Sequence, residues 1–122
     1  MRNPNQWHNC VKVSIDSLFE NKAPELLLIF DKLLAEIEAW DEVTVSATKN
    51  CIVFVHRQTF LIIRPMKRQL DLKFYSSHAL EVEPIQKSLP YNGRYINHLR
   101  LSSLEDISPI VFSLLKASYV LL

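Results

Sequence analysis

Residues 43–63 have the sequence VTVSATKNCIVFVHRQTFLII, in which alternating apolar positions give way to two continuous apolar runs. At 43–47 valine and alanine alternate with threonine and serine, a pattern that predicts a strand with one buried face. The runs at 51–55 and 60–63 are rich in β-branched and aromatic residues, and a short polar segment separates them. We therefore expect a short strand followed by a central hairpin with much of both faces covered.

Two more strands are predicted downstream of this hairpin. Apolar and polar residues alternate over 70–75 and again over 95–101. In the second of these segments Leu99 and Leu101 are expected to face the core. Residues 76–89 are expected to form a connection, with room for a helical turn near 80–85. The Asn92-Gly93 pair predicts a tight turn before the last strand.

Helices are predicted on both sides of these strands. Pro24 stands at a natural first helical position, and an apolar stripe at spacings of four and three follows it. The stripe predicts a helix from Pro24 to Trp40 that buries Leu26, Phe30, Leu33, Ile37 and Trp40. A shorter helix is expected to begin after Ser14, whose hydroxyl caps the first amides.

The end of the chain is also predicted to be helical. Ser102 and Glu105 have the spacing of a capping box, and Pro109 either kinks this helix or begins a second one capped by Ser108. The expected apolar stripe consists of Ile110, Leu114, Ala117 and Leu121. The predicted fold class is therefore α+β, with N-terminal helices, an antiparallel meander of about five strands, and a C-terminal helix packed on the sheet.

The composition excludes several classes of protein. The chain has 122 residues with 14 Lys+Arg and 13 Asp+Glu, so its net charge of +1 gives no bulk attraction to nucleic acid. Gly93 is the only glycine, whereas loops that bind phosphate through backbone amides need several. The longest apolar runs have five residues, and since a bilayer span needs ~20 we expect no membrane segment.

The sequence indicates a single domain. It contains no repeat, low-complexity tract or linker, which predicts an N-terminal tail at 1–13 and one α+β domain at 14–122. The polar start lacks the apolar segment of a secretory signal, so the expected compartment is the cytoplasm. In that reducing compartment Cys10 and Cys51 are expected to be free thiols.

Charge is distributed unevenly along the chain. Residues 14–42 contain eight acidic residues and two lysines, whereas residues 43–100 contain nine Lys+Arg and three acidic residues. A cationic sheet would bind an anionic small molecule or an acidic protein partner through charge-assisted hydrogen bonds. The alternative is that these cations are solvated residues at strand edges and loop tips. The acidic helix could also meet the basic sheet of a second copy, which would give a homodimer.

No catalytic or metal-binding set is recognisable in the sequence. The histidines lack the spacing of zinc ligands, and there is neither a Gly-x-Ser-x-Gly motif nor a pair of carboxylates in the strand region. On one strand Cys51 and His56 point to opposite faces, so we expect Cys51 to be a buried structural thiol. We assign no catalytic residue, metal or cofactor.

The expected ligand-binding residues are Lys49, Arg57, Lys67 and His98, which gather on one rim of the sheet if the last strand returns beside the central hairpin. For His98 the alternative is an ordinary surface histidine. The predicted function is a non-enzymatic binding or interaction module whose basic sheet surface takes an anionic ligand or acidic partner. The alternative function is an enzyme that uses Lys49 or His98 in acid–base chemistry.

Several short motifs resemble a known family. In chain order they are Asn5-Gln6-Trp7-His8-Asn9-Cys10, Ser14-Ile15-Asp16-Ser17-Leu18-Phe19, Lys22-Ala23-Pro24, Thr48-Lys49-Asn50-Cys51-Ile52-Val53-Phe54, Arg57, Phe60, Pro65, Lys67 and Asn97-His98-Leu99-Arg100-Leu101. With them the sequence resembles the bacterial domain-of-unknown-function family numbered fifty-six fifty-five, also described as a predicted transport-protein-like domain. The resemblance implies a small α+β domain of undetermined molecular function.

The resemblance also implies an origin for the tail at 1–13. Some relatives carry a Cys-x-x-Cys pair ahead of this segment and form a small zinc ribbon. Here His8 and Cys10 remain without the upstream cysteine pair, and two ligands from one short segment cannot close a tetrahedral site. We therefore interpret the tail as a zinc-ribbon relic that holds no metal.

Overall fold

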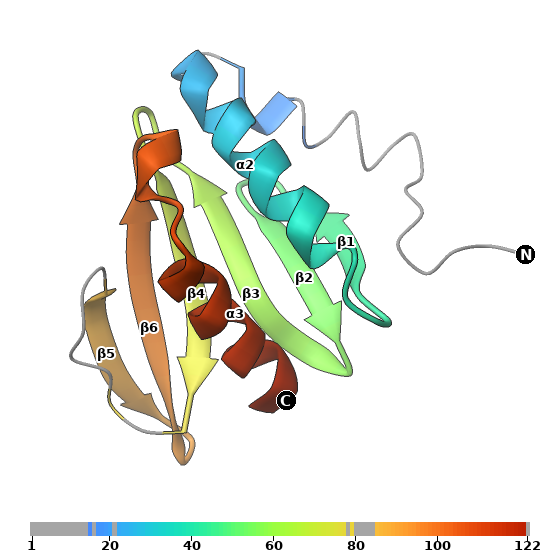
Figure 1. Cartoon of the computed structure of the whole chain (residues 1–122), viewed down its shortest axis with the longest axis vertical. Coiled ribbons are helices and arrows are strands. Elements are labelled where there is room, and N and C mark those ends of the chain that lie inside the picture. The colour runs from blue at the N-terminus through green and yellow to red at the C-terminus, as the bar shows by residue number, and fades with distance from the viewer. Residues whose placement is uncertain (1–14, 16, 21, 78, 80–84, 122) are drawn as a thin grey trace, which may run out of the picture.

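The protein has two layers in the computed structural model, which describes residues 15, 17–20, 22–77, 79 and 85–121 (Figure 1). One layer is a six-stranded antiparallel sheet in the order β1-β2-β3-β4-β6-β5. The other layer contains α2 (Pro24–Ile37) and α3 (Pro109–Leu121), which lie on the same face of the sheet. The predicted α+β class is confirmed, including the C-terminal helix packed on the sheet.

The sheet has one strand more than the sequence predicts. Its strands are β1 (Thr44–Ala47), β2 (Ile52–His56), β3 (Gln58–Pro65), β4 (Leu70–Ser76), β5 (Ile85–Tyr91) and β6 (Arg94–Leu101). The additional strand is β5, so the expectation of a connection throughout 76–89 is wrong. β5 lies at the sheet edge, where Pro90 and polar residues are tolerated because only one side is paired.

The hairpin from β5 to β6 places β6 between β4 and β5, so the last strands do not follow a simple meander. Asn92 and Gly93 connect the two strands with φ values of 49° and 78°, respectively. Two consecutive left-handed residues are typical of the turns that match the twist of a hairpin. The predicted tight turn is therefore confirmed, but it joins two strands that both belong to the sheet.

Helix α2 has the buried stripe that its spacing predicts. It begins at Pro24 and buries Leu26, Ile29, Phe30, Leu33 and Ile37 against the sheet. The helix ends three residues before the predicted end at Trp40. Trp40 is nevertheless 8% exposed, and its ring lies 6.2 Å from that of Phe60 on β3. The stripe thus extends into the turn that follows the helix.

Pro109 begins a separate helix. Of the two predicted alternatives, a kinked helix or a second helix, the second is therefore confirmed. The carbonyl of Ser108 accepts hydrogen bonds from the first amides of α3. The predicted apolar stripe of α3 is wrong in most of its positions: Ile110 and Leu121 are 55% and 36% exposed, although Leu114 packs against the core. The residues that are buried instead are Val111, Leu115, Ser118 and Tyr119.

Two polar side chains explain the orientation of α3 through three hydrogen bonds. The Ser118 hydroxyl donates to the Phe60 carbonyl at 2.7 Å and accepts from the Tyr75 amide at 3.0 Å. The Tyr119 hydroxyl donates to the Asp41 carbonyl at 2.7 Å. Because these partners lie on other elements, apolar spacing within the helix alone could not reveal which face is buried.

The capping residue before α3 also differs from the prediction by one position. The carboxylate of Asp106, in the 3-10 turn η1 (Leu104–Asp106), accepts hydrogen bonds from the amides of Ser102 and Ser103. Glu105, the predicted partner of Ser102, is exposed. The shorter aspartate makes the contact because η1 is a single tight turn.

The core lies between the helices and one face of the sheet. Residues that alternate along the strands fill it, including Ile52, Phe54, Leu61, Ile63, Leu72, Phe74, Leu99 and Leu101, all with 0% exposure. The inward orientation predicted for Leu99 and Leu101 is confirmed. The predicted tail at 1–13, the cap at Ser14, the thiol of Cys10 and most of the helical turn near 80–85 lie outside the described residues.

Candidate functional site

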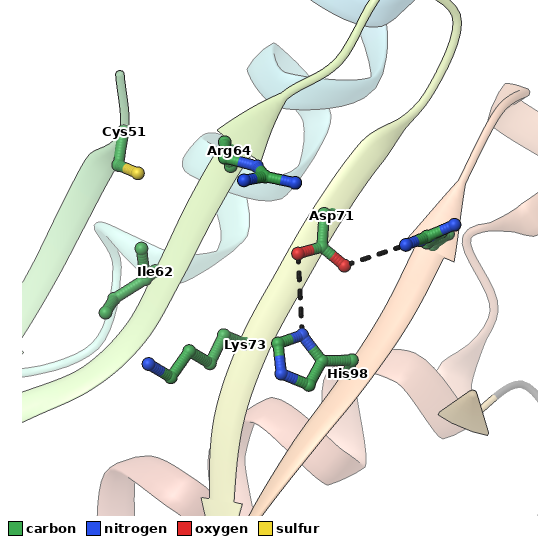
Figure 2. Close-up of a pocket in the computed structure, with 7 residues that line it drawn as sticks. Cys51, Ile62, Arg64, Asp71, Lys73 and His98 are labelled. Atoms are coloured by element: carbon green, nitrogen blue, oxygen red, sulfur yellow. Dashed lines mark ion pairs between the residues drawn. The ribbon is translucent and has the colours of Figure 1, made fainter. Parts of the chain in front are cut away.

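The face of the sheet that points away from α2 and α3 carries an open pocket of ≈ 530 Å³. It is lined by Cys51, Ile62, Arg64, Asp71, Lys73, His98 and Arg100. Figure 2 shows these side chains on neighbouring strands. Each strand residue of this set alternates with a core residue such as Leu72 or Leu99, so the strand pleat directs the two sets to opposite faces.

The strand register brings the pocket residues together in two rows. In one row Asp71 on β4 lies between Arg64 on β3 and Arg100 on β6. In the other row Lys73 on β4 lies between Ile62 on β3 and His98 on β6. Directly opposed residues have Cβ atoms about 5 Å apart, so cationic side chains from three strands surround the one carboxylate.

Asp71 is the centre of this arrangement. Its side chain is 12% exposed; one carboxylate oxygen lies 3.4 Å from Nδ1 of His98, and the other lies 3.6 Å from Nε of Arg100 (Figure 2). The oxygen facing Arg100 is buried and has no hydrogen-bond partner within the described structure. Asp71 thus pairs with Arg100 and lies beside the His98 ring, while its own hydrogen-bonding capacity remains partly unused.

Positive charge exceeds negative charge in the pocket. Arg64, Lys73 and Arg100 face one carboxylate, Asp71. Of these three cations, the described part of the chain provides an ion-pair partner only for Arg100. Lys73 and Arg64 therefore retain donors and charge that are available to an anion from solution.

The pocket lacks the geometry of nucleophilic catalysis. Cys51 precedes β2 and His98 lies on β6, with β3 and β4 between those two strands. Three strand spacings of about 4.8 Å place the thiol and the imidazole roughly 14 Å apart, too far for proton transfer between them. The described residues also include no group of three or more His, Cys, Asp or Glu side chains that could hold a metal ion. The arrangement favours binding of an anion.

Comparison with known families places the chain in one of them. A family model described as "Domain of unknown function (DUF5655)" matches residues 15–121. The chain belongs to this family. The family resemblance predicted from the motifs is therefore confirmed, while the description assigns no activity and does not mention transport. No curated protein and no solved structure matches the chain.

The structure separates the four residues that the sequence predicts as a site. His98 lines the pocket, and its predicted outward orientation is confirmed. Lys49 lies in the turn before β2 and Arg57 in the turn after it, at opposite ends of that strand. Lys67 lies in the turn between β3 and β4 and does not line the pocket. Lys49 and Lys67 thus lie in turns at the same end of the sheet, because Ile52 pairs with Ile63, whereas Arg57 lies at the other end, so the four residues do not share one rim.

The remaining pocket residues come from strands rather than turns. Lys73 and Arg100 each occupy a polar position in an alternating segment, a signal that was available in the sequence, whereas Arg64 follows the continuous apolar run at 60–63. What sequence reasoning missed is that strand register pairs them around Asp71. Cys51 also differs from expectation, because it is a free, half-buried thiol at the pocket wall rather than a buried one.

No helix in the described part of the chain is long and apolar enough to span a bilayer.

Proposed function

We propose that this protein is a non-enzymatic binding module whose open sheet face takes an anionic group. The observation that supports this proposal is the pocket itself, in which Arg64, Lys73 and Arg100 surround a single carboxylate on a face that no described helix covers. Strand pairing holds these three cations around Asp71 before a ligand arrives. Such preorganisation lowers the entropic cost of binding.

The ligand group is a carboxylate or a phosphate. The planar guanidinium groups of Arg64 and Arg100 can contact two oxygens at once, whereas Lys73 supplies a compact point charge. Both a small metabolite and an acidic side chain of a protein partner carry such groups. Asp71 reduces the total positive charge and keeps Arg100 in place, which favours a ligand of modest charge over a densely charged polyanion.

Sulfate is a suitable probe because its charge does not change across the neutral pH range. We compare the rise in melting temperature that sulfate causes in the wild type, in Lys73→Ala and in Lys49→Ala. Lys49 is the matched control because it is an exposed lysine outside the pocket. Binding at a hundredfold excess over Kd stabilises the folded state by about 2.7 kcal/mol.

We expect the wild type and Lys49→Ala to respond equally and Lys73→Ala to respond less. General salt stabilisation raises all three equally, and that result would remove the proposal. Asp71→Asn gives a second measurement, since it removes the negative charge beside the anion. We expect this variant to melt at a lower temperature without sulfate and to gain more from sulfate than the wild type does.

A second candidate function is acid–base catalysis by His98. It is favoured by the Asp71 carboxylate 3.4 Å from Nδ1, because a carboxylate in this position orients an imidazole. Lys49, the other residue predicted for this role, lies outside the pocket. Hydrolysis of p-nitrophenyl acetate or p-nitrophenyl phosphate by the wild type, lost in His98→Asn and kept in Lys49→Ala, supports this alternative.

A further inference from the structure

The exposed surface around α2 and the open face of the sheet carry opposite charge. Residues exposed on or just after α2 include Glu25, Glu36, Asp41 and Glu42, with Lys32 as the exposed cation among them. The opposite face, on the sheet, carries the basic pocket of Arg64, Lys73 and Arg100. Because α2 covers one face of the sheet (Figure 1) and the pocket residues alternate with the core residues and so point to the other face, these two surfaces cannot meet within one chain.

Both surfaces also present apolar side chains beside their charges. On α2, Leu28 is 55% exposed and lies on the same side of the helix as Glu25 and Glu36. On the open face of the sheet, Val53 and Ile62 are half-buried and occupy opposed positions on β2 and β3. A protein interface typically combines an apolar centre with a charged or polar rim, and each surface offers both parts.

We propose that the outer face of α2 in one copy of this chain docks on the open sheet face of a second copy. This inference rests on the proposed function, because it names the acidic partner that the basic face would take. The glutamates of α2 then lie against Arg64 and Lys73, and Leu28 lies against Val53 and Ile62. The sheet face of the first copy and the α2 face of the second remain unoccupied.

Charge complementarity selects this pairing over the symmetric ones. Two sheet faces together place cations against cations, and two α2 faces together place carboxylates against carboxylates, both of which are strongly unfavourable. A contact between two different surfaces is head-to-tail, so association continues to grow with protein concentration rather than ending at a dimer. Since its rim is charged, we expect the association to weaken as the salt concentration rises.

The test uses charge reversal on each surface and sedimentation velocity at low ionic strength. Glu36→Lys changes the exposed face of α2, and Lys73→Glu changes the sheet face. Lys49→Glu is the charge-matched control because Lys49 lies in a turn outside the pocket. We expect each of the first two variants to weaken self-association more than about tenfold and the control to leave it unchanged.

Mixing Glu36→Lys with Lys73→Glu restores association, because the unaltered sheet of one variant then meets the unaltered α2 of the other. Wild type that sediments as a monomer at every concentration overturns the inference. Association that survives both reversals, or a mixture that remains monomeric, also overturns it. The sulfate response separates this from the proposed function, since Glu36→Lys leaves the pocket intact and keeps the wild-type shift in melting temperature.

Discussion

The two faces of strand β4 differ although they consist of alternating residues of the same segment. Leu72 and Phe74 are completely buried against the helices, whereas Asp71 and Lys73 lie in the open pocket on the other face. The covered face carries apolar side chains, which stabilise the folded state because their surface is removed from water. The open face uses charged side chains, whose positions are set by cross-strand partners. Stability and binding can therefore be changed separately by substituting adjacent residues.

The largest effect is expected at Phe74 on the covered face. Phe74→Ala removes a ring with 0% exposure and leaves a cavity, so the free energy of unfolding should fall by about 3–5 kcal/mol. The matched substitution one position earlier, Lys73→Ala, should change it by less than about 0.5 kcal/mol, because its side chain contributes charge rather than packing. Urea denaturation of both variants measures the difference. Similar losses in both would show that the open face is also part of the stabilising core.

Local alternation explains why the covered face was predictable. The apolar positions of 70–75 and of α2 lie at the spacing of their own element, and that spacing does not depend on any distant contact. Strand β5 lacked such a signal, because it is a polar edge strand that is defined by its pairing with β6. The orientation of α3 lacked one too, because Ser118 and Tyr119 are held by partners on other elements.

Ser118 is a polar exception on the covered side, and removing its hydroxyl tests how uniform that side is. The hydroxyl connects the Phe60 carbonyl of β3 to the Tyr75 amide of β4, just beyond the last paired residues of those strands. Ser118→Ala removes both of these hydrogen bonds from the covered side of the sheet, so we expect a loss of about 2 kcal/mol. Ser113→Ala, on the exposed side of the same helix, should be nearly neutral. Equal melting temperatures for the two variants would contradict this role of Ser118.

The candidate site was less predictable than the fold because it depends on register. The charge segregation along the sequence indicated a basic sheet, and the alternation placed His98 on its outer face. Which cations meet, however, is decided by the pairing of Asp71 with Arg64 and Arg100 across two strand boundaries. Residues in turns, such as Lys49, looked equally suitable in the sequence because spacing alone does not show which of them lie beside the strand positions that form the pocket.

Tyr119 lies at the margin of the covered side, where burial and polarity meet. Burial raises the pKa of its hydroxyl above the ordinary value of 10.0, and the charges of Asp41 and Glu42 raise it further, while Arg57 opposes them. The stability that Tyr119 contributes is therefore fully present below pH 10 and is lost as the pH rises through the higher pKa of the folded state. Tyr119→Phe should cost about 1 kcal/mol at neutral pH through the hydrogen bond to Asp41.

At alkaline pH the free energies of unfolding of the wild type and of Tyr119→Phe should converge. The wild type loses stability as its tyrosine ionises, whereas Tyr119→Phe has no hydroxyl to ionise at this position. Urea denaturation at neutral pH and above pH 10 measures the change in the gap between them. A gap that stays constant would mean that the hydroxyl ionises equally easily in the folded and unfolded chain.

The smallest effect is expected at Asp106, which lies outside both faces of the sheet. Hydrogen bonds from the backbone of Ser102 and Ser103 and from the Ser102 side chain lower the pKa of its carboxyl below the ordinary value of 3.8, although partial burial opposes them. A lowered pKa means that the stabilising contribution of Asp106 is fully present above pH 3.8 and is lost as the pH falls through the folded-state value.

Asp106→Asn keeps a hydrogen-bond acceptor but not the charge. We expect its free energy of unfolding to fall by about 0.5 kcal/mol at neutral pH, because exposed charges contribute little. Thermal melts at neutral pH and below pH 3 should show this small gap closing in acid; a gap that widens there would mean that the carboxylate does not stabilise the turn before α3.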